Sequence, residues 1–438
     1  MVFKSRVLSI LFWSVIAAAF IGPGTVTTAA SAGAAYRYDL LWALVFSVIA
    51  TLVLQEASSR LTIVSGKNLG EAIRTQYFDS SRLWFLPSFV FVAIFTGCLA
   101  YEAGNILGAV AGMLLIVNLP SYILILIIGS VAAVLLYTGS TKTVVRVLGG
   151  VVGIMGVSFL TTAIMLRPSP AELFTGGFIP SFPSGSGLLI LGLIGTTVVP
   201  YNLFLGSGIS RGHTLSEMRF GLTVAVLLGG IVSMAVLVVG AAIAGPFSYE
   251  FLSETLSVQL GPAAGVLLGI GLFAAGLTSA MTAPLAAAIT ARSILAASND
   301  TRWSASSFRY RISWGIVLGT GLLFGLTKVQ PVPAIILAQA LNGIVLPFAA
   351  VFLLIAVNDR ALMGSAGLNS GLKNIVMCLV VFTTIVLGVT NVSRAAANAF
   401  GFAVENETYL LVTALGISIL LAVPVWRIIL RRRKRLLK

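Results

Sequence analysis

Two short stretches decide the fold: IGPGT at residues 21–25 and GTTVVPYN at residues 195–202. Each places glycine and proline near the middle of an apolar run that is long enough to cross a bilayer. Proline removes a backbone donor and, with glycine, leaves carbonyls that hydrocarbon cannot satisfy. Unwound backbone is tolerated at that depth only where it faces protein or a water-filled cavity. A proline kink explains either break alone, but the pair needs a different explanation.

The composition around these breaks is that of an integral membrane protein. Of the 438 residues, 58% are hydrophobic and only 9% are charged, whereas soluble domains carry about 25% charged residues. Two cysteines and one histidine argue against a disulfide framework or a Cys/His metal site. Because no nucleophile, base and orienting group converge in any motif, we expect neither an enzyme nor a cofactor.

Apolar runs separated by polar or glycine- and proline-rich segments predict twelve spans. With the amino terminus in the cytoplasm, only Arg37, Arg167, Lys328 and Arg394 of the 27 basic residues fall outside, as the positive-inside rule requires. We therefore expect both termini to be cytoplasmic and the membrane to be the plasma (inner) membrane. Membrane topology and attraction to anionic lipid then account for the net charge of +14, so we expect no nucleic-acid partner. The spans are predicted near residues 7–35, 40–63, 83–117, 121–138, 143–166, 185–210, 219–245, 260–295, 310–327, 332–357, 372–390 and 408–430.

The two breaks fall in the first and sixth predicted spans, five spans apart. A LeuT-like five-plus-five inverted repeat places its paired broken helices at these positions and binds substrate between them. The sequence thus predicts an all-helical polytopic membrane protein, a secondary transporter that we expect to be a monomer in the lipid bilayer. The predicted divisions are residues 1–167 (first repeat), 168–184 (external loop), 185–365 (second repeat), 366–430 (spans eleven and twelve) and 431–438 (basic cytoplasmic tail).

The chain resembles the Nramp divalent-metal transporters from about residue 20 to residue 365. The most specific matching segments are SGKNLGEAIR at residues 65–74 and LPFA…NDRALMG at residues 346–364, which hydrophobicity does not explain. The resemblance implies the broken-helix inverted-repeat fold and transport of a divalent metal by alternating access. It also implies a metal site at the breaks, where the family usually carries Asp-Pro-Gly-Asn in span one and Met-Pro-His in span six.

This chain departs from the family at those ligands. Gly22 stands in the place of the metal-binding Asp, and Thr25 in the place of the Asn. In span six Val199 replaces the Met and Tyr201 replaces the His. A dehydrated transition metal needs a carboxylate to offset the cost of dehydration, and the thioether favours softer ions. Tight binding of a bare transition metal is therefore not expected.

Other positions of the resemblance retain polar groups. Thr196 matches the residue whose backbone carbonyl completes the family's site, and Gln339 matches a span-ten amide that reaches the ion. In span three Glu102 keeps an acid on the proton and cation pathway, whereas Asn105 replaces a second acid there. Because the family's histidine is also missing, we expect proton coupling to be weak or absent.

Hydroxyls, amides and backbone carbonyls remain at the breaks. They suit a partly hydrated divalent cation, Mg²⁺-like or Mn²⁺, because Mg²⁺ often keeps much of its water shell. They equally suit a small non-metal solute, and a non-transporting sensor or scaffold also explains the lost ligands. The candidate substrate-binding residues are Gly22, Thr25, Thr28, Thr196, Thr197, Val199, Tyr201, Asn202, Gln339 and Asn342, of which Thr25, Thr196 and Gln339 are the candidate metal contacts, directly or through water.

Each polar residue also has a structural interpretation. Threonine and asparagine in spans often satisfy helix backbone, and Gln339 and Asn342 suit interhelical hydrogen bonding as well as they suit a substrate. Glu102 has no basic residue within two turns of its own span, so it either carries protons or cations or is a hydrogen-bonded buried acid. Glu56 lies four residues before Arg60, a spacing that predicts an ion pair along one helix.

Overall fold

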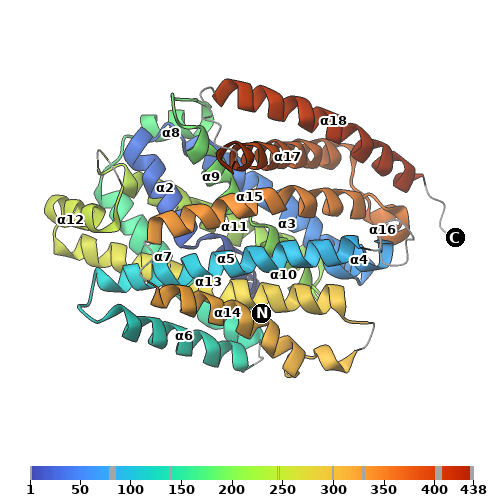
Figure 1. Ribbon diagram of the computed structural model, residues 1–438, viewed down its shortest axis with the longest axis horizontal. Coiled ribbons are helices and arrows are strands. Elements are labelled where there is room, and N and C mark those ends of the chain that lie inside the picture. The colour runs from blue at the N-terminus through green and yellow to red at the C-terminus, as the bar shows by residue number, and fades with distance from the viewer. Residues whose placement is uncertain are drawn as a thin grey trace.

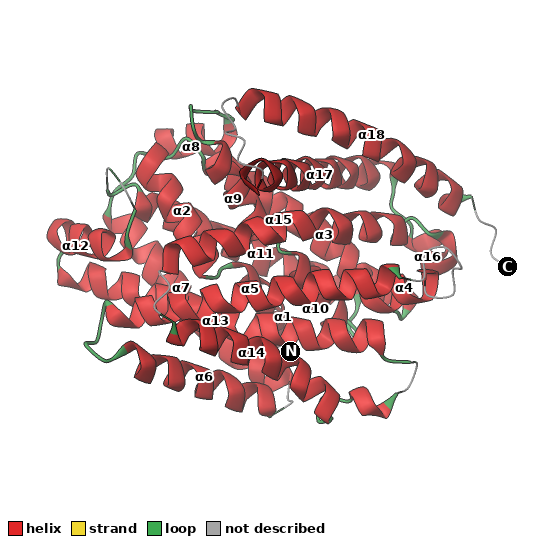
Figure 2. Cartoon of the chain, viewed as in Figure 1, coloured by secondary structure: helices red, strands yellow, loops and turns green. Residues whose placement is uncertain are grey.

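The computed structural model describes residues 2–77, 85–138, 141–243, 245, 247–297, 300–327, 331–399 and 407–434. Within these ranges every regular element is helical (Figure 2). The elements are α1 (Val2–Phe20), α2 (Pro23–Tyr36), α3 (Leu41–Ser65), α4 (Leu69–Tyr77), α5 (Leu86–Leu114), α6 (Ser121–Tyr137), α7 (Thr141–Met165), α8 (Pro170–Phe178), α9 (Gly187–Thr197), α10 (Pro200–Ile209), α11 (Leu215–Gly240), α12 (Tyr249–Leu260), α13 (Pro262–Leu295), η1 (Thr301–Trp303), α14 (Phe308–Leu326), α15 (Pro331–Ala356), α16 (Arg360–Gly367), α17 (Gly371–Ala399) and α18 (Glu407–Arg433).

Each predicted apolar run contains at least one helix at its position. Among the described residues, eight helices are long and apolar enough to cross a membrane, or ten if each bent pair is one span. The other two predicted spans correspond to α6, which has only 17 residues, and to α14, which begins with two arginines in its first four residues. The chain is an all-helical polytopic membrane protein, and the exact count of twelve spans stays a prediction.

Both predicted helix breaks are confirmed. In the first span α1 and α2 are bent by 64° around residues 21 and 22. Gly22 precedes α2 with extended backbone (ψ −177°), and Pro23 occupies a first helical position where no amide donor is needed. In the sixth span Val198 and Val199 leave the helical conformation between α9 and α10, and Pro200 begins the second half.

Among the described residues, four short α-helices and the 3-10 helix η1 lie outside the predicted spans. One of them, α8, falls within the segment predicted as an external loop, so that segment is not irregular throughout. Its start is well formed because the Ser169 side chain accepts a hydrogen bond from the Glu172 amide and Pro170 occupies the first turn. At the opposite end of the molecule lie α4 and α16, together with the end of α18 (Figure 1).

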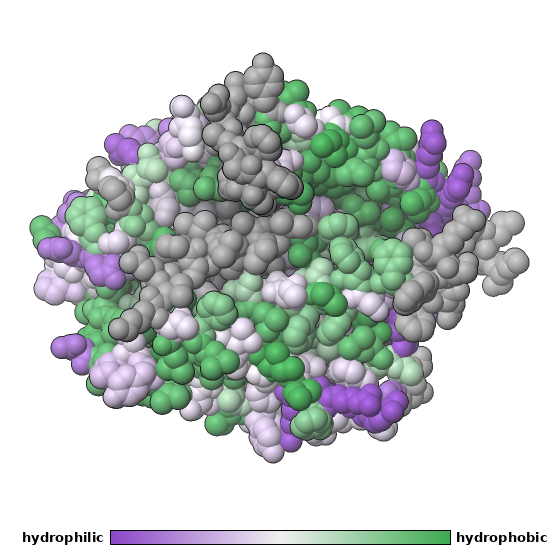
Figure 3. Space-filling model, viewed as in Figure 1, coloured by the Kyte–Doolittle hydropathy of each residue, from purple (hydrophilic) through white to green (hydrophobic). Residues whose placement is uncertain are grey.

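Small residues let the central helices approach closely. The 34-residue α13 packs along α5 and also contacts α7, α12 and α14. A Cβ on Gly276 of α13 would lie 2.6 Å from the Cα of Ala109 in α5, so only glycine fits there. By contrast, α18 lies at the periphery, and only 17% of its apolar window is buried. Figure 3 shows hydrophobic surface across the middle and hydrophilic residues toward the two ends, as a bilayer requires.

Candidate functional site

The structure brings the two helix breaks into direct contact. The hydroxyls of Thr25 and Thr196 lie 2.9 Å apart, and the Thr25 hydroxyl is also 3.5 Å from the Thr196 carbonyl. The Thr25 and Thr196 side chains are 0% and 1% exposed. Residues 171 positions apart in the chain therefore join the first and sixth spans at the depth where each helix is interrupted.

Hydroxyl groups of the protein donate hydrogen bonds to the carbonyls that the break in the first span leaves free. The last three carbonyls of α1 belong to residues 18–20. In order, they accept hydrogen bonds from Ser279 of α13 at 3.4 Å, from Tyr201 of α10 at 3.0 Å, and from Thr25 of α2. The unwound backbone thus meets the requirement that no polar group be left unsatisfied in the membrane. Each of these carbonyls therefore already accepts one hydrogen bond from a protein hydroxyl.

Neighbouring side chains fill the space beside Gly22, the position predicted from the resemblance to match the family's carboxylate. A Cβ on Gly22 would lie 2.5 Å from the hydroxyl oxygen of Ser279 and 3.6 Å from the amide oxygen of Asn105. α13 and α5 therefore pack closely against the break at Gly22. Ser279 is a site residue that the sequence interpretation missed. Its signal was the pattern of hydroxyls at residues 278, 279 and 282 in an otherwise apolar span.

The other predicted residues divide between contact with the breaks and internal backbone bonding. Tyr201 and Asn202 reach across to α1, since the Asn202 amide donates to the carbonyl of residue 16 at 3.1 Å. Thr28 packs on α9, where a Cβ on Gly192 would lie 2.8 Å from its methyl group. Thr197 donates to a carbonyl of its own helix at 3.0 Å, and Val199 is the buried residue that caps α10. The side chains at positions 339 and 342 lie outside those that the structure describes.

A row of hydroxyls on α3 supports the broken sixth span. Ser47, Thr51, Ser58 and Thr62 donate to the carbonyls of residues 193, 197, 203 and 207, at 3.5, 3.2, 2.7 and 2.9 Å respectively. The bond from Thr51 satisfies the carbonyl at the end of α9, where the helix is interrupted. Sequence reasoning missed this row as well, although its spacing of four, seven and four residues is that of one helix face.

Glu102 lies beside the site and is fully buried. One of its carboxylate oxygens accepts a hydrogen bond of 3.2 Å from the Asn105 amide. The other has no hydrogen-bond partner among the described groups. A Cβ on Gly321 of α14 would lie 2.5 Å from the Glu102 side chain, so glycine leaves room for the acid between two helices. Asn105, predicted from the resemblance to replace a second acid, is therefore the hydrogen-bond donor to Glu102.

Charged and amide groups gather at the end of the molecule that holds α4 and α16. The predicted pair is confirmed, because Arg60 donates to Glu56 at 3.1 Å. In SGKNLGEAIR, Asn68 and Glu71 cap α4 reciprocally, each side chain accepting the other's backbone amide at 2.9 Å. In NDRALMG, Asp359 caps α16 through the amide of residue 361 at 2.9 Å. The two specific sequence segments thus shape this polar end rather than the helix breaks.

The donor set at the breaks is neutral. Among the described residues, no group of three or more His, Cys, Asp or Glu side chains is placed to hold a metal ion. The available donors are hydroxyls, amides and backbone carbonyls, which suit hard cations and their water shells better than soft transition metals.

Comparisons with known proteins support the relationship that the motifs indicate. A family described as "Natural resistance-associated macrophage protein-like" matches residues 14–394. The chain belongs to the Nramp family. Two curated relatives of this Nramp chain are named "Divalent metal cation transporter MntH". The protein from Bacillus subtilis is 27% identical and the match covers 86% of this chain and 89% of the relative. That from Deinococcus radiodurans is 28% identical, with coverage of 82% and 84%.

Solved structures of other transporters share the fold of this Nramp chain. A manganese transporter from Eremococcus coleocola, in complex with an aromatic bis-isothiourea substituted compound, matches with a TM-score of 0.74 at 19% identity. The match covers 99% of this chain and 95% of that chain. A nucleobase-cation-symport-1 family transporter in a closed conformation matches with a TM-score of 0.58 at 17% identity, covering 97% and 92%. The relatives are named as transporters, which agrees with the prediction that this chain is not an enzyme.

Proposed function

We propose that this Nramp-family chain is a secondary transporter that moves a partly hydrated divalent cation, Mg²⁺ or Mn²⁺, by alternating access. Family membership and the names of the curated relatives support divalent-metal transport. The neutral donors around Thr25, Thr196 and Tyr201 support a cation that keeps part of its water shell, since none of the three supplies a carboxylate. Gln339 belongs to the same proposed site.

The contact between Thr25 and Thr196 carries the mechanistic part of the proposal. It closes the route between the two breaks with one hydroxyl–hydroxyl bond of 2.9 Å. A single neutral hydrogen bond contributes about 0.5–1.5 kcal/mol net, so thermal motion opens it easily. Glycine and proline at both breaks allow the half-helices to move about these points. A hydrated ion would replace the direct contact with contacts from each threonine to the ion or its waters.

Topology and energy coupling complete the proposal. We place twelve spans in a five-plus-five inverted repeat with two further spans, both termini in the cytoplasm, in the plasma (inner) membrane. Proton coupling is weak or absent because Asn105 and Tyr201 replace titratable groups of the family's route. Glu102 then serves to attract the cation toward the breaks. Acidification of proteoliposomes during uptake that depends on the substrate cation and vanishes in Glu102→Gln would contradict this part.

Cation uptake into proteoliposomes tests the transport proposal. We expect uptake of Mg²⁺ or Mn²⁺ above that of empty liposomes, reduced at least several-fold in Thr25→Ala and in Thr196→Ala. Thr290→Ala is the matched control, because Thr290 is buried in α13 and donates at 2.7 Å to its own helix. Uptake that is equal in the two site variants and the control would reject the site.

One observation favours a second candidate function, a non-transporting sensor or scaffold. The breaks are closed directly on each other, and the free carbonyls of α1 are occupied by protein hydroxyls. A sensor binds the cation without moving it. Cation binding measured by titration calorimetry, together with uptake no greater than that of empty liposomes, would select this function over transport.

A further inference from the structure

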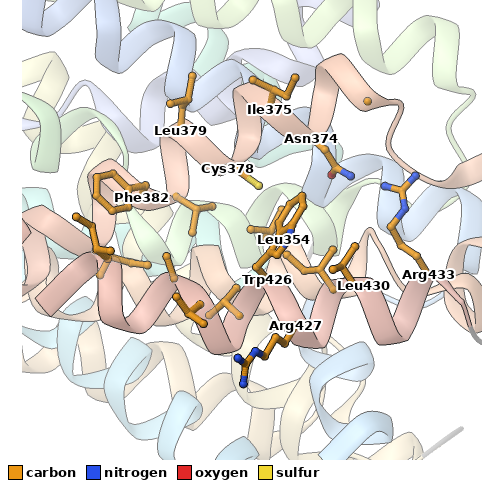
Figure 4. A pocket seen from close by; sticks show the side chains of 18 residues that line it. Leu354, Asn374, Ile375, Cys378, Leu379, Phe382, Trp426, Arg427, Leu430 and Arg433 are labelled. Atoms are coloured by element: carbon orange, nitrogen blue, oxygen red, sulfur yellow. The ribbon is translucent and has the colours of Figure 1, made fainter. Parts of the chain in front are cut away.

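A groove of about 890 Å³ separates the last two long helices, α17 and α18. This volume lies toward the upper end of the range of about 300–1,000 Å³ for small-molecule sites. Figure 4 shows Cys378 and Phe382 of α17 on one side and Trp426 and Leu430 of α18 on the other. None of the residues that line the groove belongs to the helix breaks, so the candidate transport site does not account for it.

The lining of the groove is amphipathic from one end to the other. On α18, residues 419, 423, 426 and 430 are apolar and lie on one helix face, because they are spaced by three or four positions. The next position of the same face is Arg433, which lies at the end of the groove beside Asn374 of α17 (Figure 4). The other lining arginine, Arg427, points away from the remaining labelled side chains (Figure 4). The groove is thus an apolar slot with the charge of Arg433 at one end.

Neutral groups hold the arginine in place without neutralising it. Arg433 donates to the side-chain oxygen of Asn358 at 2.7 Å and to the carbonyl of Asn369 at 3.2 Å. A guanidinium carries five N–H donors, so two such bonds leave further donors for an anion. Among the described residues that line the groove, none is acidic. The nearby carboxylate of Asp359 is bound by Arg432 instead.

The position of the groove exposes it to acyl chains. The apolar window of α18 is only 17% buried, and Trp426 is 49% exposed. The basic residues at the end of α18 are those predicted to face the cytoplasmic leaflet, which is rich in anionic lipid. We propose that an anionic glycerophospholipid occupies this groove, with an acyl chain between α17 and α18 and its phosphate at Arg433. Arginine binds phosphate through paired N–H donors. Charge complementarity selects an anionic headgroup over a zwitterionic one because no choline ammonium then offsets the phosphate charge or is repelled by Arg433.

Quenching of Trp426 by brominated lipids tests the proposal on the full chain in liposomes. The Trp426 signal is the difference between the wild type and Trp426→Phe. We expect brominated phosphatidylglycerol to reach half-maximal quenching at a membrane fraction at least threefold lower than brominated phosphatidylcholine. Arg433→Gln should remove this preference. Cys378→Phe, which fills the slot without changing charge, should weaken quenching by both lipids.

Two further variants distinguish a lipid bound in the groove from general electrostatic attraction of anionic lipid to the protein and from structural damage caused by the substitution. Arg431→Gln removes the same charge from an exposed residue that does not line the groove, so it should keep the preference. Arg433→Lys keeps the charge but loses the forked contacts, and it should keep most of the preference. Equal quenching by the two lipids in the wild type would overturn the proposal. So would loss of the preference in Arg431→Gln, or a loss in Arg433→Lys as complete as in Arg433→Gln.

Discussion

Replacing Gly22 with alanine tests how tightly the broken first span packs against α13. The added Cβ would lie 2.5 Å from the Ser279 hydroxyl oxygen and 3.3 Å from the Ser279 Cβ. Rotation of the hydroxyl relieves the first contact but breaks its bond to α1, and relief of the second requires the backbone to shift. Overpacking of a buried site costs about 1–3 kcal/mol. We expect Gly22→Ala to lower the free energy of unfolding by about 2 kcal/mol.

A double-mutant cycle with Ser279→Gly isolates this contact from the other effects of each substitution. Unfolding in mixed micelles by titration with a denaturing detergent, followed by tryptophan fluorescence, gives the four free energies. Because Ser279→Gly removes both clashing atoms, we expect a coupling energy of about 1–2 kcal/mol between the two substitutions. Ser233→Gly is the control, since Ser233 is buried in α11 and donates to its own helix at 3.1 Å. Additive effects of Gly22→Ala and Ser279→Gly would refute the packing argument.

Three further substitutions test other parts of the structure. Arg60→Leu removes the bonds from Arg60 to Glu56 and to the carbonyl of Gly367, while Arg219 and Lys373 still pair with Glu56, so it should lower the free energy of unfolding by about 1–3 kcal/mol in the same titration; an unchanged free energy of unfolding would contradict this. Thr51→Val leaves the carbonyl of residue 197 unsatisfied at the sixth-span break, and should cost about 1–3 kcal/mol by the same measurement, whereas a neutral effect would show that the bond contributes nothing. Burial against Phe12 lowers the pKa of His213 from its ordinary value of 6.5, so the folded state favours the neutral ring. This contribution to the stability of the folded state is present above pH 6.5 and is lost as the pH falls toward the folded-state pKa. Between pH 7.5 and pH 5 the melting temperature should therefore fall less in His213→Gln than in the wild type. An equal fall in the two proteins would exclude the effect.

Local chemistry made the helix breaks and the ion pair on α3 predictable. Glycine and proline close together near the middle of an apolar run weaken the helix, so residues 22–23 and 198–200 could be located without tertiary information. A single proline is a weaker signal, since α13, α15 and α18 each continue through one. The pair of Glu56 and Arg60 follows from a spacing of four residues on one helix. The short helices α8 and α16 were not predicted, because each has fewer than ten residues and its stability depends on a cap and on packing.

The partners of the break residues could not be predicted, because they come from distant parts of the chain. Ser279 and the row of hydroxyls on α3 lie on apolar helices whose sequence does not show which neighbour each face meets. The same pattern of threonine and serine serves equally for bonding within one helix, as Thr197 shows. Only the packing of α3 and α13 against the breaks distinguishes the two roles.

By itself, the sequence determined that the chain crosses a membrane, where its helices break, and that no carboxylate lies at those breaks. These properties follow from composition and from residue-by-residue backbone chemistry. Only the tertiary structure decided that Thr25 contacts Thr196, and that the hydroxyls of Tyr201 and Ser279 donate hydrogen bonds to the carbonyls at the end of α1. The physical reason is that a freed carbonyl in the membrane must find a donor, and the choice among many buried hydroxyls is made by helix packing.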